Sequence, residues 1–247
     1  MGLAKETTAS AIREVDRLVG IDIQGNRDSP YAVLSKDGRM VDSGWIRGGT
    51  DTERCRFLLD KVKQLETDAR GPIAFGIDSP RGFLPRPRRF YPVYKKSCWR
   101  PRKQDEKGHG RHCELIISTL RIAIPQWTPV QSDLRPDQDW MKTGAALFEA
   151  LAGRPHVYEV FPSASYKLLA GEPNARIEID FAQFTPGPKD MLDACLGAFT
   201  VSEFLNGRGC EVGNADGLGA IVLPRDKTSD IPEFMVTIPS ELLDGTD

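Results

Sequence analysis

Two short apolar segments of this chain end in the same three residues, Gly-Ile-Asp. The first is Val19-Gly20-Ile21-Asp22 and the second is Phe75-Gly76-Ile77-Asp78. A continuous apolar run of this length is typical of a strand with both faces covered. An aspartate at its end places a carboxylate at the rim of the sheet. The repeated ending therefore predicts a sheet that presents Asp22 and Asp78 where a site can form.

Taken singly, Asp22 and Asp78 also fit turns in which the side chain accepts backbone hydrogen bonds. A second carboxylate pair, Asp190 and Asp193, lies in Asp190-Met191-Leu192-Asp193-Ala194. Residues three apart share one helix face, and this pair either complements the start of a helix or holds a cation. Four converging carboxylates repel one another unless cations lie between them, and their oxygens suit Mg²⁺ or Mn²⁺. We therefore expect a divalent-metal site assembled from these four aspartates.

Length and composition bound the class of protein. The chain has 247 residues, 40% hydrophobic and 28% charged, with a formal net charge of −2, which is typical of a soluble globular protein. No apolar run approaches the ~20 residues of a membrane helix. The first residues lack the apolar core of a signal peptide. Because the five cysteines are odd in number and scattered, we expect reduced thiols and a cytoplasmic location.

Strand and helix patterns alternate along the chain. Strands are predicted at 17–23, 31–34, 40–45, 72–78, 156–161 and 217–224, and helices at 50–69, 113–124, 141–151, 164–169 and 189–206. This order predicts an α/β fold, a mixed sheet of three antiparallel strands and then parallel strands, flanked by helices. We expect a single domain over 18–225, with irregular segments at 81–112 and 171–188 and peripheral termini at 1–17 and 226–247.

Several motifs, taken in their order along the chain, carry a family resemblance. They are Val19-Gly20-Ile21-Asp22, Gly76-Ile77-Asp78-Ser79-Pro80-Arg81-Gly82, Arg111-His112-Cys113-Glu114, Tyr158-Glu159-Val160-Phe161-Pro162, Asp190-Met191-Leu192-Asp193-Ala194-Cys195-Leu196-Gly197-Ala198 and Gly219-Ala220-Ile221-Val222-Leu223-Pro224. Together they resemble the RNase H-like superfamily of metal-dependent nucleases. More closely, they resemble its family of predicted nucleases known as domain of unknown function 429. The resemblance spans 18–225 and implies an RNase H-like fold.

The resemblance also implies an activity. The Asp-x-x-Asp-Ala pattern is similar to that of RuvC-type Holliday-junction resolvases. By that analogy Asp22 bridges two metals, Asp78 holds one of them, and Asp190 with Asp193 holds the other. Two metals about 4 Å apart can activate a water and stabilise the leaving oxygen of a phosphodiester. We therefore expect a Mg²⁺- or Mn²⁺-dependent nuclease with these aspartates as its catalytic ligands.

Two glutamates are further candidates, and the resemblance places both near the site. Glu159 stands at a predicted strand end and is a fifth catalytic carboxylate, as a ligand or in support of one. The alternative for Glu159 is an ordinary pair with a basic residue. Glu114 follows Arg111 at a predicted helix start, where a helix cap or an Arg–Glu pair is the alternative to a role beside the substrate.

The segment 86–112 is a basic insertion. Ten Lys and Arg lie between Arg86 and Arg111, against the two acids Asp105 and Glu106, and four aromatic residues are interleaved. Basic groups bind phosphates and aromatic faces stack on bases, although a solvated loop has the same composition. We expect a nucleic acid partner, DNA or RNA. The substrate contacts that we expect come from Arg81, Arg100, Arg102, Lys103, Arg111 and Glu114. The oligomeric state stays open, a dimer included.

Two other classes of function compete with a nuclease. Actin-like or sugar-kinase-like phosphotransferases also begin with a strand that ends in Asp. They need a glycine-rich phosphate loop next, and Ile23-Gln24-Gly25-Asn26-Arg27-Asp28-Ser29 holds one glycine. A non-catalytic nucleic-acid-binding or protein-binding module is the other alternative, and the near-complete set of carboxylates argues against it.

Overall fold

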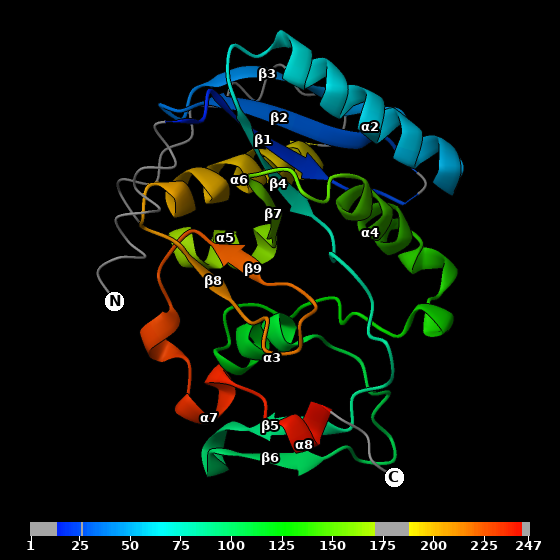
Figure 1. Ribbon diagram of the computed structural model, residues 1–247, viewed down its shortest axis with the longest axis vertical. Coiled ribbons are helices and arrows are strands. Elements are labelled where there is room, and N and C mark those ends of the chain that lie inside the picture. The colour runs from blue at the N-terminus through cyan, green and yellow to red at the C-terminus, as the bar shows by residue number, and fades with distance from the viewer. Residues whose placement is uncertain (1–13, 26, 171–187, 244–247) are drawn as a thin grey trace.

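A seven-stranded sheet organises the computed structural model, which describes residues 14–25, 27–170 and 188–243 (Figure 1). The strand order is β3–β2–β1–β4–β7–β9–β8. The strands are β1 (Arg17–Asp22), β2 (Ser29–Ser35), β3 (Met40–Ile46), β4 (Ile73–Asp78), β7 (Val157–Val160), β8 (Cys210–Val212) and β9 (Ile221–Leu223). Strand β2 pairs antiparallel with β1 and β3, whereas β1, β4, β7 and β9 run parallel. The predicted mixed sheet is confirmed, and β8 adds an antiparallel edge strand that the sequence analysis missed.

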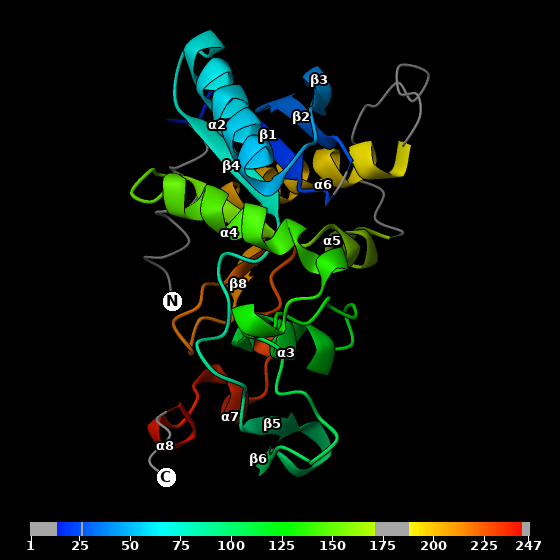
Figure 2. The same ribbon diagram turned by 90° about the vertical axis from the view of Figure 1, so that its right-hand side faces the viewer.

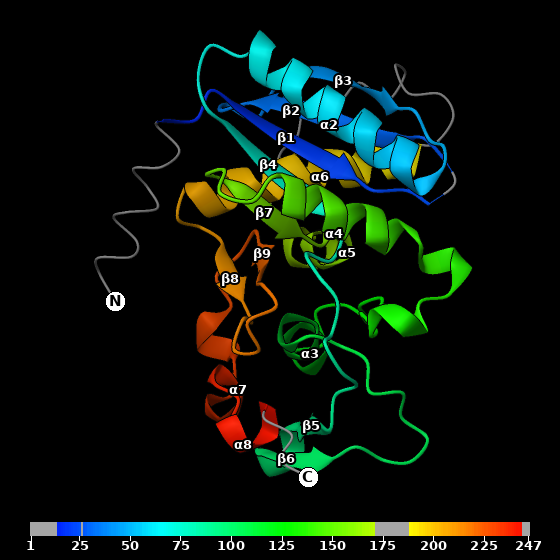
Figure 3. The ribbon, with the colours of Figure 1, turned by 45° about the vertical axis from the view of Figure 1, so that its right-hand side comes forward.

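Helices cover both faces of this sheet. They are α2 (Asp51–Asp68), α3 (His112–Thr119), α4 (Trp140–Ala150), α5 (Pro162–Leu169), α6 (Pro188–Leu205), α7 (Glu233–Val236) and α8 (Ser240–Leu243). Figure 3 shows α2 and α4 on one face and α6 on the other. The helix predicted to run to Ile124 ends at Thr119 instead. Arg121 adopts a left-handed φ of 56°, and Pro125 disfavours helical backbone at the residue before it.

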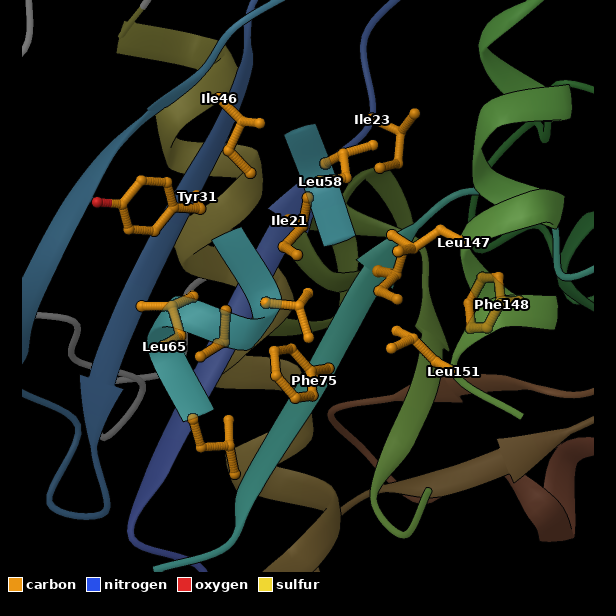
Figure 4. Close-up of a cluster of buried hydrophobic side chains, with 14 of the residues drawn as sticks. Ile21, Ile23, Tyr31, Ile46, Leu58, Leu65, Phe75, Leu147, Phe148 and Leu151 are labelled. Carbon is orange, nitrogen blue, oxygen red and sulfur yellow. The ribbon is translucent and has the colours of Figure 1, made fainter. Parts of the chain in front are cut away.

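Alternation along the strands divides the core into two layers. Ile21 and Phe75 point toward α2 and α4 and pack with Leu58 and Leu147 (Figure 4). The intervening residues of the same strands, such as Leu18 and Ala74, face α6. Asp22 and Asp78 belong to this second set, because each lies an even number of residues from Leu18 or Ala74. Strand periodicity therefore delivers both carboxylates to the α6 side.

The glycines of the Gly-Ile-Asp endings let α6 approach the sheet closely. A Cβ at Gly20 would collide with the carbonyl oxygen of Ala194, and one at Gly76 would lie 2.6 Å from that of Gly197. Helix α6 therefore lies backbone to backbone on β1 and β4. This contact explains why glycine precedes Ile-Asp in both strands, and it brings the start of α6 next to the strand ends.

The insertion 86–112 is more ordered than the sequence predicts. Strands β5 (Phe90–Val93) and β6 (Cys98–Pro101) form an antiparallel hairpin, joined by the 3₁₀ turn Tyr94–Lys96. Figures 1 and 2 show this hairpin beside α7 and α8, at the end of the molecule opposite β3 and α2. The prediction of irregular structure over 81–112 is therefore wrong for the residues of this hairpin.

The described part of the tail 226–247 packs against α3, β8 and β9. Met235 is fully buried in the cluster that also holds residues of α3, β8 and β9. The indole Nε1–H of Trp99 donates to the carbonyl of Phe234 at 3.0 Å, and His112 Nε2 lies 2.8 Å from the carbonyl of Met235. The prediction of a peripheral C-terminus needs correction over these residues. Within the described residues, no helix combines the length and the apolar character needed to cross a bilayer.

Candidate metal centre

Three aspartates from opposite ends of the chain meet at one edge of the sheet. Asp22 ends β1, and the first turns of α6 carry Asp190 and Asp193. One carboxylate oxygen of each lies within 4.8 Å of the others. We call Asp22, Asp190 and Asp193 the aspartate cluster. Such separations let one or two cations contact all three residues, which is the juxtaposition expected from the sequence for these three positions.

Asp78 stands beside the aspartate cluster without belonging to it. It is the register partner of Asp22 on the neighbouring parallel strand, and it lines the same cavity of about 280 Å³. Burial raises the pKa of Asp78 well above its ordinary value, and repulsion from Asp22 and Asp193 adds to the shift. The predicted set of four aspartates therefore shares one cavity, although the tight group contains only three of them.

The electrostatics of the cluster disfavour several negative charges at once. Burial, followed by repulsion from Asp193, raises the pKa of Asp22 from 3.8 to about 7, against a hydrogen bond from Gln24 that lowers it. Burial also raises the pKa of Asp193, and Lys189 opposes that shift. Buried carboxylates that repel one another favour a proton or a cation between them. The cluster is therefore disposed to take up positive charge.

Each carboxylate of the cluster already has a polar partner from the mouth of the cavity. Arg27 Nη1 lies 3.0 Å from an oxygen of Asp190, and Lys189 Nζ lies 3.3 Å from an oxygen of Asp193. The amide of Gln24 donates to Asp22 at 2.6 Å and accepts from Arg27 at 2.6 Å. The Arg27 and Lys189 side chains are 67% and 80% exposed. These ion pairs are therefore open to water and weak.

A second carboxylate group in the same cavity is bonded differently. Arg111, 1% exposed, forms ion pairs with both Glu114 and Glu159. Its Nη1 donates to Glu159 at 2.8 Å, and Glu114 also accepts from the backbone N–H of Thr128 at 2.9 Å. We call Arg111, Glu114 and Glu159 the arginine network. For both glutamates the geometry agrees with the alternative of an Arg–Glu pair.

Glu159 has a further partner that fixes the loop after β4. It accepts the backbone N–H of Arg81 at 2.9 Å. Both carboxylate oxygens of Glu159 therefore accept hydrogen bonds from the protein, from Arg111 and from the backbone of Arg81. Glu159 also lies outside the group of three carboxylates that could share an ion. The role that this geometry supports for Glu159 is to position the segment that carries Asp78, rather than to act as a fifth ligand.

The residues predicted to contact substrate do not gather in one place. Arg111 and Glu114 line the cavity but are buried in the arginine network. Arg81 stacks over the ring of Phe148 and donates to the carbonyl of Val157 at 2.8 Å, outside this cavity. In the insertion, Arg100 is paired with Glu106. Neither it nor Arg102 or Lys103 lines the cavity.

The hairpin nevertheless presents a basic surface. Among the described residues, no carboxylate forms an ion pair with the exposed side chains of Arg86, Arg89, Lys95, Lys96, Arg102, Lys103 and Lys107. Tyr94, at the same turn as Lys95 and Lys96, is 59% exposed. The unneutralised charge of the insertion therefore lies around the hairpin turn and its flanks, and Arg100 is not part of it.

Sequence reasoning missed Gln24, Arg27 and Lys189 as parts of the site. Lys189 had a readable signal, because it lies four residues before Asp193 on the same helix and can therefore pair with it. Arg27 had none, since only the fold brings the segment after β1 next to α6. Comparison of the chain with models of protein families, with curated proteins and with solved structures finds no match.

Proposed function

We propose that this protein is a metal-dependent nuclease that hydrolyses phosphodiester bonds of DNA or RNA. The observation that carries the proposal is the aspartate cluster, with its oxygens within 4.8 Å of one another at the ends of a buried strand and a helix. Asp78 lies beside it in the same cavity. The sheet has three antiparallel strands followed by parallel strands, as the RNase H-like resemblance of the sequence implies. Membership of the family known as domain of unknown function 429 is part of the proposal and rests on the sequence motifs alone.

The donor set fits Mg²⁺ or Mn²⁺. All the candidate ligands are carboxylate oxygens, with no thiolate or imidazole among them, and hard cations of this kind prefer such oxygens. The pKa of Asp22 gives a second reason, because burial and then repulsion from Asp193 raise it, and a cation beside the carboxylate would oppose both effects. Asp22, Asp190 and Asp193 would hold the ion, with Asp78 as a fourth ligand at the cavity wall.

When bound, such ions activate a water and neutralise the charge that develops on a phosphodiester. The chain's own residues supply the rest of the site. Gln24 orients the Asp22 carboxylate through its amide N–H. Glu159 fixes the loop that follows Asp78 through the N–H of Arg81. The basic hairpin offers a surface for the phosphate backbone outside the cavity, which supports a nucleic acid as the substrate.

A cleavage assay with a matched variant tests this proposal. Labelled single- and double-stranded DNA, RNA, an RNA–DNA hybrid and a four-way junction are incubated with Mn²⁺ and either wild type, Asp22→Asn/Asp193→Asn or Asp60→Asn/Asp68→Asn. The last variant removes the same two charges from exposed positions of α2. We expect cleavage by wild type and by the α2 variant, and none by the cluster variant. Failure of wild type to cut any of these substrates would contradict the proposal.

A further inference from the structure

The two exposed cations at the cavity mouth differ from most surface ion pairs in what they touch. Arg27 and Lys189 reach into the cavity and each meets a different member of the aspartate cluster. Their partners Asp190 and Asp193 are only 17% and 12% exposed. The carboxylates therefore lie below, and the basic groups cover them on flexible side chains that extend from solvent.

These two ion pairs neutralise the aspartate cluster only weakly, because both basic side chains are exposed to water. An ion pair with one exposed partner contributes little, because water competes for the cation and the long side chain loses conformational freedom. A divalent cation held by three carboxylates interacts much more strongly with the same oxygens. It would therefore displace Arg27 and Lys189 from Asp190 and Asp193. The arginine network shows the contrast, since Arg111 is buried between its two glutamates and cannot be exchanged in this way.

Displacement does not remove the basic groups from the site. Arg27 is still attached two residues from Gly25 at the cavity wall, and Lys189 lies directly before Asp190. A guanidinium binds two phosphate oxygens at once, and an ammonium binds phosphate as a point charge. After displacement, the Arg27 guanidinium and the Lys189 ammonium would no longer be paired with Asp190 and Asp193. They would still lie at the opening of the cavity, where a phosphodiester would enter.

We propose that Arg27 and Lys189 are exchangeable cations, which occupy the aspartate cluster in the metal-free protein and bind the substrate's phosphate once a divalent cation has displaced them. This inference rests on the proposed metal centre and deepens it, because it names the residues that hold the phosphodiester. It also assigns the phosphate contacts inside the cavity to residues other than Arg81, Arg111 and Glu114.

The test measures two affinities that should move in opposite directions. Mn²⁺ binding to wild type, Arg27→Gln and Lys189→Gln is measured by calorimetry. Binding of short fluorescein-labelled single-stranded DNA, and of its RNA counterpart, is measured by anisotropy with Ca²⁺, which takes the same oxygen ligands. We expect each variant to bind Mn²⁺ about two- to five-fold more tightly, because a competing ion pair is gone. We expect each to bind the oligonucleotide about tenfold more weakly, with a salt dependence smaller by about 0.7 in slope.

Matched controls separate this effect from general loss of charge. Arg135→Gln and Lys227→Gln remove basic groups that pair with Asp137 and Asp230 at 3.0 Å and 2.9 Å, outside the cavity. Both controls should leave the two affinities unchanged. Weakening of both affinities in Arg27→Gln and Lys189→Gln would mean that these residues only support the structure, and any result other than the opposite pair overturns the inference. If wild type binds Mn²⁺ and cleaves, but the variants do not show tighter Mn²⁺ binding together with weaker oligonucleotide binding, the inference alone fails. If wild type does not bind Mn²⁺, the proposed function fails with it.

Discussion

The cavity at the edge of the sheet contains two groups of carboxylates that are neutralised in opposite ways. In the arginine network, a buried guanidinium lies between Glu114 and Glu159, and its bonds are shielded from water. In the aspartate cluster, the counter-charges are the exposed side chains of Arg27 and Lys189, and burial with repulsion from Asp193 raises the pKa of Asp22 to about 7. Two carboxylate groups in one cavity therefore differ in their fitness for a metal, and nearness of acidic groups alone does not define a metal site. What matters is whether their counter-charges are fixed or exchangeable.

Removal of Arg111 should give the largest effect on stability. Arg111→Met leaves two buried glutamates without their cation, and we expect a loss of about 3–5 kcal/mol in the free energy of unfolding, measured with urea. Arg135→Met removes an exposed arginine paired with the exposed Asp137 and should cost less than about 1 kcal/mol. Replacing Glu114 and Glu159 by Gln in the Arg111→Met background should recover part of the loss. A cost for Arg111→Met as small as the control would remove the distinction between the two groups.

The aspartate cluster depends on close packing rather than on a buried cation. Gly20→Ala forces a methyl group against the backbone of Ala194, and overpacking of this kind costs about 1–3 kcal/mol. Because α6 must move away from β1, we expect Mn²⁺ binding to weaken as well, by calorimetry. Gly82→Ala is the control, since a Cβ there meets no atom within 4 Å. Unchanged Mn²⁺ affinity in a destabilised Gly20→Ala would show that the cluster does not need this contact.

Substitution of Asp22 should raise the free energy of unfolding, whereas substitution of Arg111 should lower it. Its folded pKa of about 7 exceeds its ordinary value of 3.8. The folded state therefore holds a proton that the unfolded state has lost, and the stability that Asp22 contributes falls as pH rises from about 4 to 7. We expect Asp22→Asn to stabilise the metal-free protein by about 1–2 kcal/mol at pH 8, and to flatten this part of the pH profile. Urea midpoints measured from pH 4.5 to pH 8 check this, and equal destabilisation at every pH would indicate a structural carboxylate instead.

The hairpin of the insertion should give the smallest effect. Lys95→Gln/Lys96→Gln removes two exposed charges at its turn, and we expect oligonucleotide affinity to fall about two- to five-fold, with a shallower salt dependence. Lys36→Gln/Arg39→Gln makes the same change at the turn between β2 and β3 and should have no effect. Equal weakening by both double variants would mean that oligonucleotide affinity depends on net charge rather than on this hairpin.

The strongest patterns in the sequence predicted the scaffold well. Apolar runs located β1, β4 and β7 to within about two residues, because burial of those strands dominates their composition. The Asp-Gly turn chemistry between β2 and β3 located that hairpin equally well, although β3 is largely exposed. The strand β8 is three residues long, and the β5–β6 hairpin carries arginines, lysines and prolines. Their pairing comes from long-range packing, such as Trp99 against Phe234, which no local pattern indicates.

For the site, the sequence indicated which aspartates converge but not which basic groups pair with the carboxylates. The predicted convergence of Asp22, Asp190 and Asp193 depended on strand ends and helix spacing, both of which are local. The roles of Glu159 and Arg111 depended on a contact across 48 residues of chain, and that of Arg27 on one across more than 160. Such partners decide whether a carboxylate is free for an ion, and they become visible only in three dimensions.

A calorimetric titration with Mn²⁺ decides whether the aspartate cluster or the arginine network holds the ion. The comparison is among wild type, Asp22→Asn/Asp193→Asn and Glu159→Gln, under one buffer and pH. We expect wild type and Glu159→Gln to bind Mn²⁺ with similar affinity, and the double variant not to bind it. Loss of Mn²⁺ binding in Glu159→Gln, with binding kept in the double variant, would place the ion in the arginine network rather than in the aspartate cluster.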